Sequence, residues 1–216
     1  MIIGLAGKAG AGKDTVALLL HNNYGFSPLA FADNLKLLCR SVFKVNKKQC
    51  YDPEFKERKF ATPIKFTPEA IEKICTYAEV KNGFTVSEEQ RFKMYKYVGE
   101  LKTFKTPREL LQFIGTEILR EIIDDEYHIK VVKSKMDKEA LHVITDARYE
   151  NERAKVKEWE GKTVYIERPS NKKDVGFKNH ASENSLGQLT DYDFVISNSG
   201  SIDDLALEVD RLVNNL

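Results

Sequence analysis

The chain begins with MIIGLAGKAGAGKDT (residues 1–15), a short apolar run followed by a glycine-rich loop. An apolar run of this length that ends in glycine predicts a buried β-strand over residues 1–6. Val16, Leu19 and Leu20 then follow at helical spacing, which predicts a helix over residues 14–24. A strand, a glycine loop and a helix in this order are typical of the start of an α/β fold.

The loop Gly7–Lys13 has the spacing G-x-x-x-x-G-K, which is that of a P-loop. Its glycines permit a tight turn whose backbone N–H groups point at an anion, and the following helix adds its positive N-terminal end. We therefore expect the loop to bind ATP, with Lys13 reaching the outer phosphates and offsetting the charge that builds up during transfer. The predicted ATP-binding residues of this segment are Gly7, Ala9, Gly10, Ala11, Gly12, Lys13, Asp14 and Thr15.

The residue after Lys13 departs from the usual loop, which has Ser or Thr there to bind magnesium. This chain has Asp14 instead, and the hydroxyl group comes one residue later, at Thr15. A carboxylate is also a hard oxygen ligand, so we expect Asp14 to bind Mg²⁺ directly or through water. The Asp-Thr pair argues against GTPases and motor ATPases, and is closer to the loop of nucleoside monophosphate kinases.

The rest of the chain alternates between predicted strands and helices. Such alternation predicts an α/β fold with a three-layer core, in which a parallel sheet of about five strands is covered on both faces. We expect one domain over residues 1–216, with the irregular residues 44–105 as an inserted, helical substrate-binding lobe. The further predicted strands are 26–31, 141–145, 163–167 and 193–197, and the further predicted helices are 33–43, 151–160 and 202–212.

Charged and polar residues follow the predicted strands, where the ligands of parallel sheets bind. Asp146, Arg148 and Glu152 come after the strand at 141–145, and Arg168 comes directly after the strand at 163–167. Arginine can hold a phosphate through two hydrogen bonds, and a carboxylate can take a sugar hydroxyl or magnesium-bound water. A helix cap with a surface ion pair is the alternative interpretation of Asp146 and Arg148.

Residues 168–190 form a polar, basic stretch, which we interpret as a lid that closes over phosphates and excludes water. An ordinary solvated loop is the alternative. Asn198, after the last predicted strand, is placed to pack against an adenine ring through backbone groups, or simply to start a helix. The basic residues of the lid are Lys172, Lys173, Lys178 and His180, of which Lys172 and Lys173 are predicted to contact ATP.

The segment that begins at Thr106 predicts an amphipathic helix. Thr106 and Glu109 form a capping box around Pro107 at the first helical position. One face carries apolar residues every three or four positions, and another stripe is polar. The apolar residues are Leu111, Ile114, Ile118 and Ile122, and the polar stripe, a candidate acceptor contact, is Arg108, Gln112, Thr116 and Arg120.

Composition narrows the classes of partner. The net charge of +1 gives no overall field that favours nucleic acid or membrane as partners. Three cysteines, Cys39, Cys50 and Cys75, with no C-x-x-C pair, argue against zinc and against a disulfide framework, and fit a reducing cytoplasm. We find no signal peptide and no apolar segment that approaches the length of a membrane span.

Taken together, these segments resemble the bacteriophage-type deoxynucleoside monophosphate kinases, relatives of the nucleoside monophosphate kinases. The resemblance implies ATP and Mg²⁺ as cofactors, transfer to a dNMP to give a dNDP, and a homodimer in the cytoplasm of an infected bacterial host. It places Lys13, Arg148 and Arg168 among the catalytic residues, and adds Asp33 and Lys36 to the acceptor site that also holds Asp146, Arg148 and Glu152. The segments that carry it are the Gly-Lys-Asp-Thr loop, 31–36 (FADNLK), 107–117 (PRELLQFIGTE), Asp146-x-Arg148 with Glu152, Arg168-Pro169 with His180, and 193–201 (DFVISNSGS).

Two other classes of protein remain open at this point. Phosphomevalonate kinases of the P-loop type also carry Gly-Lys-Asp, and dephospho-coenzyme A kinases share the architecture; residues 112–116 (QFIGT) favour the nucleotide kinase. A non-catalytic nucleotide-binding regulator would need the loop but not the charges at Asp146, Arg148 and Arg168. A panel of acceptors separates the kinases, and single-turnover ATP consumption tests the regulator.

Overall fold

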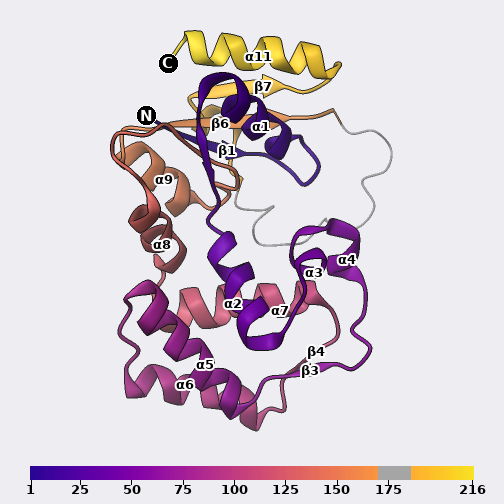
Figure 1. Cartoon of the computed structure of the whole chain (residues 1–216), viewed down its shortest axis with the longest axis vertical. Helices are drawn as coiled ribbons and strands as arrows, with labels where there is room; N and C mark the ends of the chain where they lie inside the picture. Colours follow the sequence, from indigo (N-terminus) through magenta and orange to yellow (C-terminus); the bar gives the residue numbers. More distant parts are fainter. Residues whose placement is uncertain (170–185) are drawn as a thin grey trace. The chain divides into compact units, whose positions relative to one another are not determined.

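The computed structural model describes residues 1–169 and 186–216, and these residues form two compact units (Figure 1). The sheet unit comprises residues 1–31 and 132–216, and the helical unit comprises residues 32–131. The helical unit contains the predicted insertion 44–105 and extends beyond it at both ends. This unit is one continuous stretch of sequence, inserted between two strands of the sheet.

The sheet unit is built on five parallel strands in the order β2-β5-β1-β6-β7. The central strand β1 pairs with β5 on one side and β6 on the other, so the loop that follows β1 emerges in the middle of the sheet. The predicted α/β class and parallel sheet are confirmed. The strands are β1 (Ile2–Ala6), β2 (Ser27–Leu29), β5 (His142–Ile144), β6 (Lys162–Glu167) and β7 (Phe194–Ser197).

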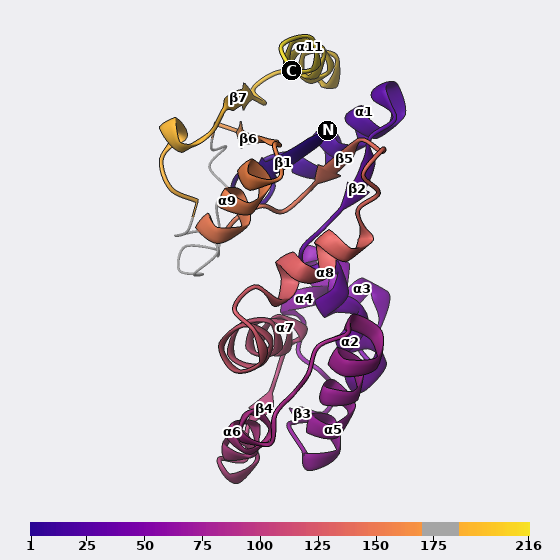
Figure 2. The same cartoon turned by 90° about the vertical axis from the view of Figure 1, so that its left-hand side faces the viewer.

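Helices cover both faces of this sheet (Figures 1 and 2). On one face α1 (Lys13–Tyr24) and α11 (Ile202–Asn214) pack against the strands and share their apolar core. On the other face lies α9 (Glu150–Glu158), where a Cβ at Gly4 of β1 would come 3.0 Å from Cγ2 of Val156. The short η3 (Leu189–Asp191) precedes β7. The close approach of α9 thus depends on glycine in the central strand.

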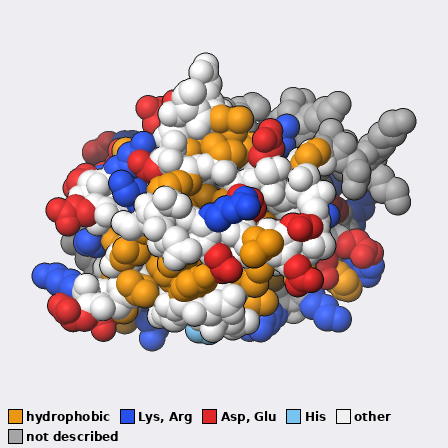
Figure 3. All heavy atoms as spheres, turned by 90° about the horizontal axis from the view of Figure 1, so that it is seen from above, with side chains coloured by type: hydrophobic (Ala, Val, Ile, Leu, Met, Phe, Trp, Pro, Cys, Tyr) orange, Lys and Arg blue, Asp and Glu red, His pale blue; other side chains and the backbone are white. Residues whose placement is uncertain are grey.

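Figure 3 shows the face of the molecule that carries α11, where small groups of hydrophobic side chains lie among charged ones. Exposed hydrophobic residues of α1, β7 and α11 are Leu18, Val195, Ile202 and Leu207. Isolated residues of this kind are common on protein surfaces and mark no binding site by themselves. Within residues 1–169 and 186–216, no helix has the length and apolar character to cross a bilayer.

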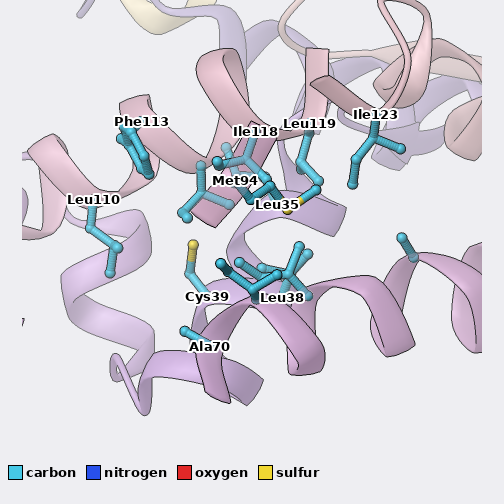
Figure 4. Packing of buried hydrophobic residues seen from close by; sticks show 14 of the residues in the cluster. Leu35, Leu38, Cys39, Ala70, Met94, Leu110, Phe113, Ile118, Leu119 and Ile123 are labelled. Atoms are coloured by element: carbon cyan, nitrogen blue, oxygen red, sulfur yellow. The ribbon is translucent and has the colours of Figure 1, made fainter. Parts of the chain in front are cut away.

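The helical unit has its own apolar core, formed by residues of α2, α5, α6, α7 and η2 (Figure 4). All three cysteines are free and buried in this unit, and burial raises the pKa of Cys75 to about 11. Its elements are α2 (Asp33–Phe43), α3 (Lys47–Tyr51), α4 (Pro53–Glu57), β3 (Ile64–Lys65), α5 (Pro68–Thr76), η1 (Tyr77–Lys81), α6 (Glu88–Gly99), β4 (Thr103–Phe104), α7 (Pro107–Phe113), η2 (Ile114–Ile123) and the first half of α8 (Tyr127–Lys135).

The prediction of one α-helix from Pro107 to Ile122 is wrong in its second half. α7 ends at Phe113, and η2 continues as a π-helix, whose hydrogen bonds span five residues instead of four. The wider turn moves the buried stripe, so Ile122 is only half-buried while Leu119 and Ile123 are in the core. The cap at Thr106 forms as predicted, but the Glu109 carboxylate accepts from the N–H of Lys105 instead of completing the box.

A buried histidine holds the start of this π-helix. Nε2 of His128 lies 3.2 Å from the carbonyl oxygen of Gly115, so it carries the proton and donates it. A Cβ at Gly115 would lie 2.8 Å from Cδ2 of Leu35, so a larger residue there would require the Leu35 side chain to move. Burial, helped by the positive charge of Arg120, lowers the pKa of His128 from 6.5 to about 4. The imidazole is therefore neutral at physiological pH.

This pKa predicts a loss of stability in mild acid. Between about pH 6.5 and about pH 4 the unfolded chain binds the His128 proton and the folded chain does not, so stability falls as the pH falls through this window. From about pH 7.5 to about pH 5.5 the loss should be roughly 1 kcal/mol. The measurement is urea unfolding of the wild type and of His128→Gln, which keeps an N–H donor but does not titrate. If both proteins lose the same stability over this range, His128 is not the titrating group.

Candidate active site

Three glycines shape the loop between β1 and α1. Gly7, Gly10 and Gly12 have φ angles of +139°, +76° and +103°, a region that other residues rarely adopt. A Cβ would come within 2.4 Å of the Ile166 carbonyl oxygen at Gly7 and of Asn198 Nδ2 at Gly12, but would meet no described atom within 4 Å at Gly10. The base of the loop is therefore packed against β6 and the end of β7. This cradle fits a phosphate group, since such loops turn successive N–H groups toward an anion.

Lys13 lies inside the loop and is only 8% exposed. Its Nζ donates to the carbonyl oxygens of Gly7, at 2.6 Å, and Lys8, at 2.7 Å. These bonds fold the long side chain back over the loop and fix its ammonium group beside the backbone of Gly7 and Lys8. An anion that enters the loop meets a cation already in place, which reduces the reorganisation needed when charge develops.

The ends of β6 and β7 also reach this loop. Arg168, one residue after β6, donates from Nη1 to the carbonyl oxygen of Gly10 at 3.3 Å. Asn198, one residue after β7, donates from Nδ2 to the carbonyl oxygen of Ala11 at 2.8 Å, while its backbone N–H bonds to the carbonyl oxygen of Glu167. The structure thus brings three predicted site residues, Lys13, Arg168 and Asn198, to one loop at the carboxyl edge of the sheet.

Asp146 lies on the other side of β1, two residues after β5. Its Oδ1 accepts from the backbone N–H of Phe31 at 2.7 Å, and the next residue, Ala147, bonds through its N–H to Leu5 of β1. The carboxylate therefore ties the chain after β2 to the turn after β5. This bond occupies one carboxylate oxygen and fixes the orientation of the group.

Glu152, in the first turn of α9, is 2% exposed. Its Oε2 accepts from the backbone N–H groups of Arg148, at 2.9 Å, and Tyr149, at 3.0 Å. Arg153, which the sequence interpretation did not single out, donates from Nη1 to the carbonyl oxygen of Arg148 at 2.6 Å. Arg148 itself is half-buried. The Glu152 carboxylate thus holds the backbone of Arg148.

Asp33, Lys36 and Arg108, three of the predicted acceptor residues, have charged partners within the helical unit. Lys36 pairs with Asp33 at 3.1 Å, and its Nζ lies 4.3 Å from the centre of the Tyr51 ring. Arg108, at the start of α7, pairs with Glu57. Gln112 on α7 and Thr116 on η2 are half-buried, and the π-turn between them changes the stripe that an α-helix would give.

Asp14, the residue predicted to hold magnesium, is at the start of α1. Asp14 is exposed in its first turn and Thr15 follows, so a carboxylate and a hydroxyl lie directly after the phosphate loop. Hard oxygen donors of this kind fit Mg²⁺. The predicted lid residues Lys172, Lys173, Lys178 and His180 lie outside the described residues.

Comparison with known proteins supports this interpretation of the loop. A model of the deoxynucleotide monophosphate kinase family matches residues 1–209. A curated protein of Acanthamoeba polyphaga mimivirus, whose name provisionally assigns it the same activity, is 27% identical over 228 residues, which cover 100% of this chain and 97% of that protein.

Solved structures with a similar arrangement include a dephospho-CoA kinase from Campylobacter jejuni and the protein TT1252 from Thermus thermophilus. The first is 14% identical with a TM-score of 0.39 and covers 99% of this chain and 96% of its own. The second is 17% identical with a TM-score of 0.38 and covers 100% and 97%. Scores at this level add nothing to the assignment, which depends on the match along the sequence. That match covers the phosphate loop, the residues after β5, β6 and β7, and the whole helical unit. The chain therefore belongs to the deoxynucleotide monophosphate kinase family and is a phosphotransferase.

Proposed function

We propose that this chain transfers the terminal phosphate of ATP to a deoxynucleoside 5′-monophosphate, giving ADP and the deoxynucleoside diphosphate. An oxygen of the acceptor phosphate attacks the γ-phosphorus, a new P–O bond forms, and the bond from the γ-phosphorus to the β–γ bridging oxygen breaks, leaving its electrons on ADP. The observation that carries the proposal is the convergence of Lys13, Arg168 and Asn198 on one glycine loop. Membership of the family supports the choice of acceptor.

The donor side of the reaction is assigned to the loop and its neighbours. Lys13 and Arg168 are placed to offset the negative charge of the transferred phosphoryl group, which is the main contribution that proteins make to this chemistry. Asp14 would hold Mg²⁺, and the ion would supply positive charge that offsets the charge of the phosphates. We retain Lys172 and Lys173 as further ATP contacts from the sequence.

The acceptor side is assigned first to Arg148. Its planar guanidinium matches phosphate oxygens and stays charged throughout the reaction. Asp146 and Glu152 do not bind the phosphate, because carboxylates repel it. Their proposed roles are to bind a sugar hydroxyl, to hold magnesium-bound water or to orient Arg148. An acceptor role for Asp33, Lys36, Arg108, Gln112 and Thr116 stays a prediction from the sequence.

The biological setting is also a proposal. Resemblance to bacteriophage-type enzymes supports a homodimer that supplies dNTP precursors in the cytoplasm of an infected bacterial host. Small molecules are the proposed partners, without nucleic acid or membrane. The near-neutral net charge of +1 is consistent with this choice.

A coupled ADP-release assay across acceptors tests the proposed function. The panel contains all deoxy- and ribonucleoside monophosphates, phosphomevalonate and dephospho-coenzyme A, each with ATP and Mg²⁺. We expect turnover with at least one deoxynucleoside monophosphate and none with the last two. Turnover only with phosphomevalonate or dephospho-coenzyme A would replace the proposed acceptor while leaving the phosphotransferase in place.

Asn198 provides a test of the donor side. Asn198→Ala removes the bond to the Ala11 carbonyl oxygen, a loss of about 1 kcal/mol for a neutral hydrogen bond. The Michaelis constant for ATP should rise roughly fivefold. That for the acceptor should not change. Ser199→Ala, in the same turn but exposed, is the matched control and should behave like the wild type. An unchanged ATP constant in Asn198→Ala would remove this residue from the ATP site.

A further inference from the structure

Arg153 is a buried cation in α9 that the reaction as described above does not use. It is only 7% exposed, and a charge is costly to bury unless it is well paired. Its Nη1 donates to the carbonyl oxygen of Arg148 at 2.6 Å, and its guanidinium carbon lies 5.2 Å from the centre of the Tyr192 ring. One side chain therefore contacts both the turn after β5 and the segment before β7.

The bond to Arg148 completes a clamp on that residue. Oε2 of Glu152 accepts the backbone N–H of Arg148 at 2.9 Å, and Arg153 donates to its carbonyl oxygen. Both backbone polar groups of Arg148 are thus held by consecutive residues of one helix. With both groups fixed, the backbone dihedral angles of Arg148 have little freedom, and the direction in which its side chain leaves the backbone is set.

The other contact anchors the clamp. Tyr192 is 8% exposed, and its hydroxyl donates to the carbonyl oxygen of Leu186 at 2.5 Å. A Cβ at Gly187 would lie 3.1 Å from Nη2 of Arg153, so the guanidinium also lies close to this backbone. A cation over an aromatic face is attracted to it, most of all where water is excluded. The Tyr192 ring and the Gly187 backbone thereby restrict the guanidinium to the position from which it reaches Arg148.

We propose that Arg153 is a positioning residue for the acceptor phosphate: it holds the Arg148 backbone so that the Arg148 guanidinium meets the phosphate in the orientation that transfer requires. The inference rests on the proposed function, since it assigns Arg148 to the acceptor. The proposed role also explains why residue 153 is an arginine and not a lysine. A guanidinium donates at its edge while its face lies on a ring, whereas a lysine ammonium supplies a donor without a flat face.

The test is a double-mutant cycle on Arg148 and Arg153 with dNMP kinetics as the readout. Arg153→Met keeps an unbranched side chain that can still pack beside the Tyr192 ring, but it is shorter and loses the donor. We expect its kcat/KM for the dNMP to fall roughly 10-fold, because small misplacements of a reacting group have large kinetic effects. Its ATP affinity should be unchanged. Arg153→Lys, which retains a donor, should recover part of the loss. In an Arg148→Ala background, Arg153→Met should cost nothing further in kcat/KM, since it acts through Arg148.

Lys157→Met is the matched control on the same helix. Lys157 donates to the carbonyl oxygen of Asp191 at 3.0 Å, so it tethers the same segment to α9 without touching Arg148. It should lose some stability and keep normal dNMP kinetics. Arg153 variants that melt lower but show wild-type kcat and KM would overturn the proposal, as would full additivity of the two substitutions. A wild-type protein that phosphorylates no dNMP would overturn the proposed function itself, a result distinct from either of these.

Discussion

Lys13→Met is expected to fold and melt almost like the wild type but to turn over at least ~100-fold more slowly. The ammonium group lies at the inner rim of the glycine loop, held by the Gly7 and Lys8 carbonyl oxygens. Methionine has a similar length and fills the same space, so the loop keeps its packing but loses its cation. Phosphoryl transfer depends on positioning and charge neutralisation more than on covalent chemistry, so the loss appears in the transition state, at about 3 kcal/mol.

The measurement is steady-state turnover together with a thermal melt of each protein. Lys8→Met is the matched control, because Lys8 is in the same loop but exposed, and this variant should stay close to the wild type. Near-normal turnover of Lys13→Met would mean that the loop is not the site of transfer. Loss of turnover with a collapsed melting curve would assign Lys13 to the fold instead.

Arg148→Ala should raise the Michaelis constant for the dNMP and lower turnover, reducing kcat/KM about 100-fold. The reaction brings two anions together, so the acceptor phosphate needs a cation separate from those on ATP. Arg148 follows β5, the strand next to β1, and two side chains of α9 clamp its backbone. Losing two charge-assisted hydrogen bonds to a phosphate accounts for an effect of this size.

ATP binding to Arg148→Ala, measured separately by calorimetry, should be almost unchanged. Arg211→Ala, an exposed arginine on α11 paired with Glu208, is the matched control for removing a positive charge. Two outcomes would move Arg148 out of the acceptor site: dNMP kinetics that stay normal, or ATP affinity that falls as severely as dNMP affinity. A variant that loses only stability would indicate that the turn is purely structural.

The strands of the sheet could be predicted because the sequence patterns that indicate them are local. Each strand is a short apolar run between a turn and a helix, and burial of a parallel sheet on both faces requires such runs. The glycine loop could be predicted for the same reason, since its backbone conformation is set by its own glycines. Arg168 and Asn198 followed from topology, because the residues after parallel strands meet at one edge.

The features that sequence did not reveal depend on contacts between distant residues. The π-turn at Gly115 is held by His128, and no local propensity signals it. Arg108 looked available for a phosphate, but in the folded chain it pairs with Glu57, which lies on another helix. Arg153 carried no signal because its burial depends on packing against the Tyr192 ring, which is far along the chain. A charged helix residue is usually solvated, and only the packing shows that this one is buried.

We expect ATP bound at Gly7–Lys13 to pass its terminal phosphate to a dNMP. The most direct measurement incubates the protein with Mg²⁺, each dNMP in turn and ATP that is radiolabelled in the γ-phosphate, and then separates the products by chromatography. We expect label in the β-phosphate of a deoxynucleoside diphosphate, one ADP for each diphosphate formed, and loss of both products in Lys13→Met. Label that appears only in free phosphate, or in a diphosphate made equally well by Lys13→Met, would contradict it.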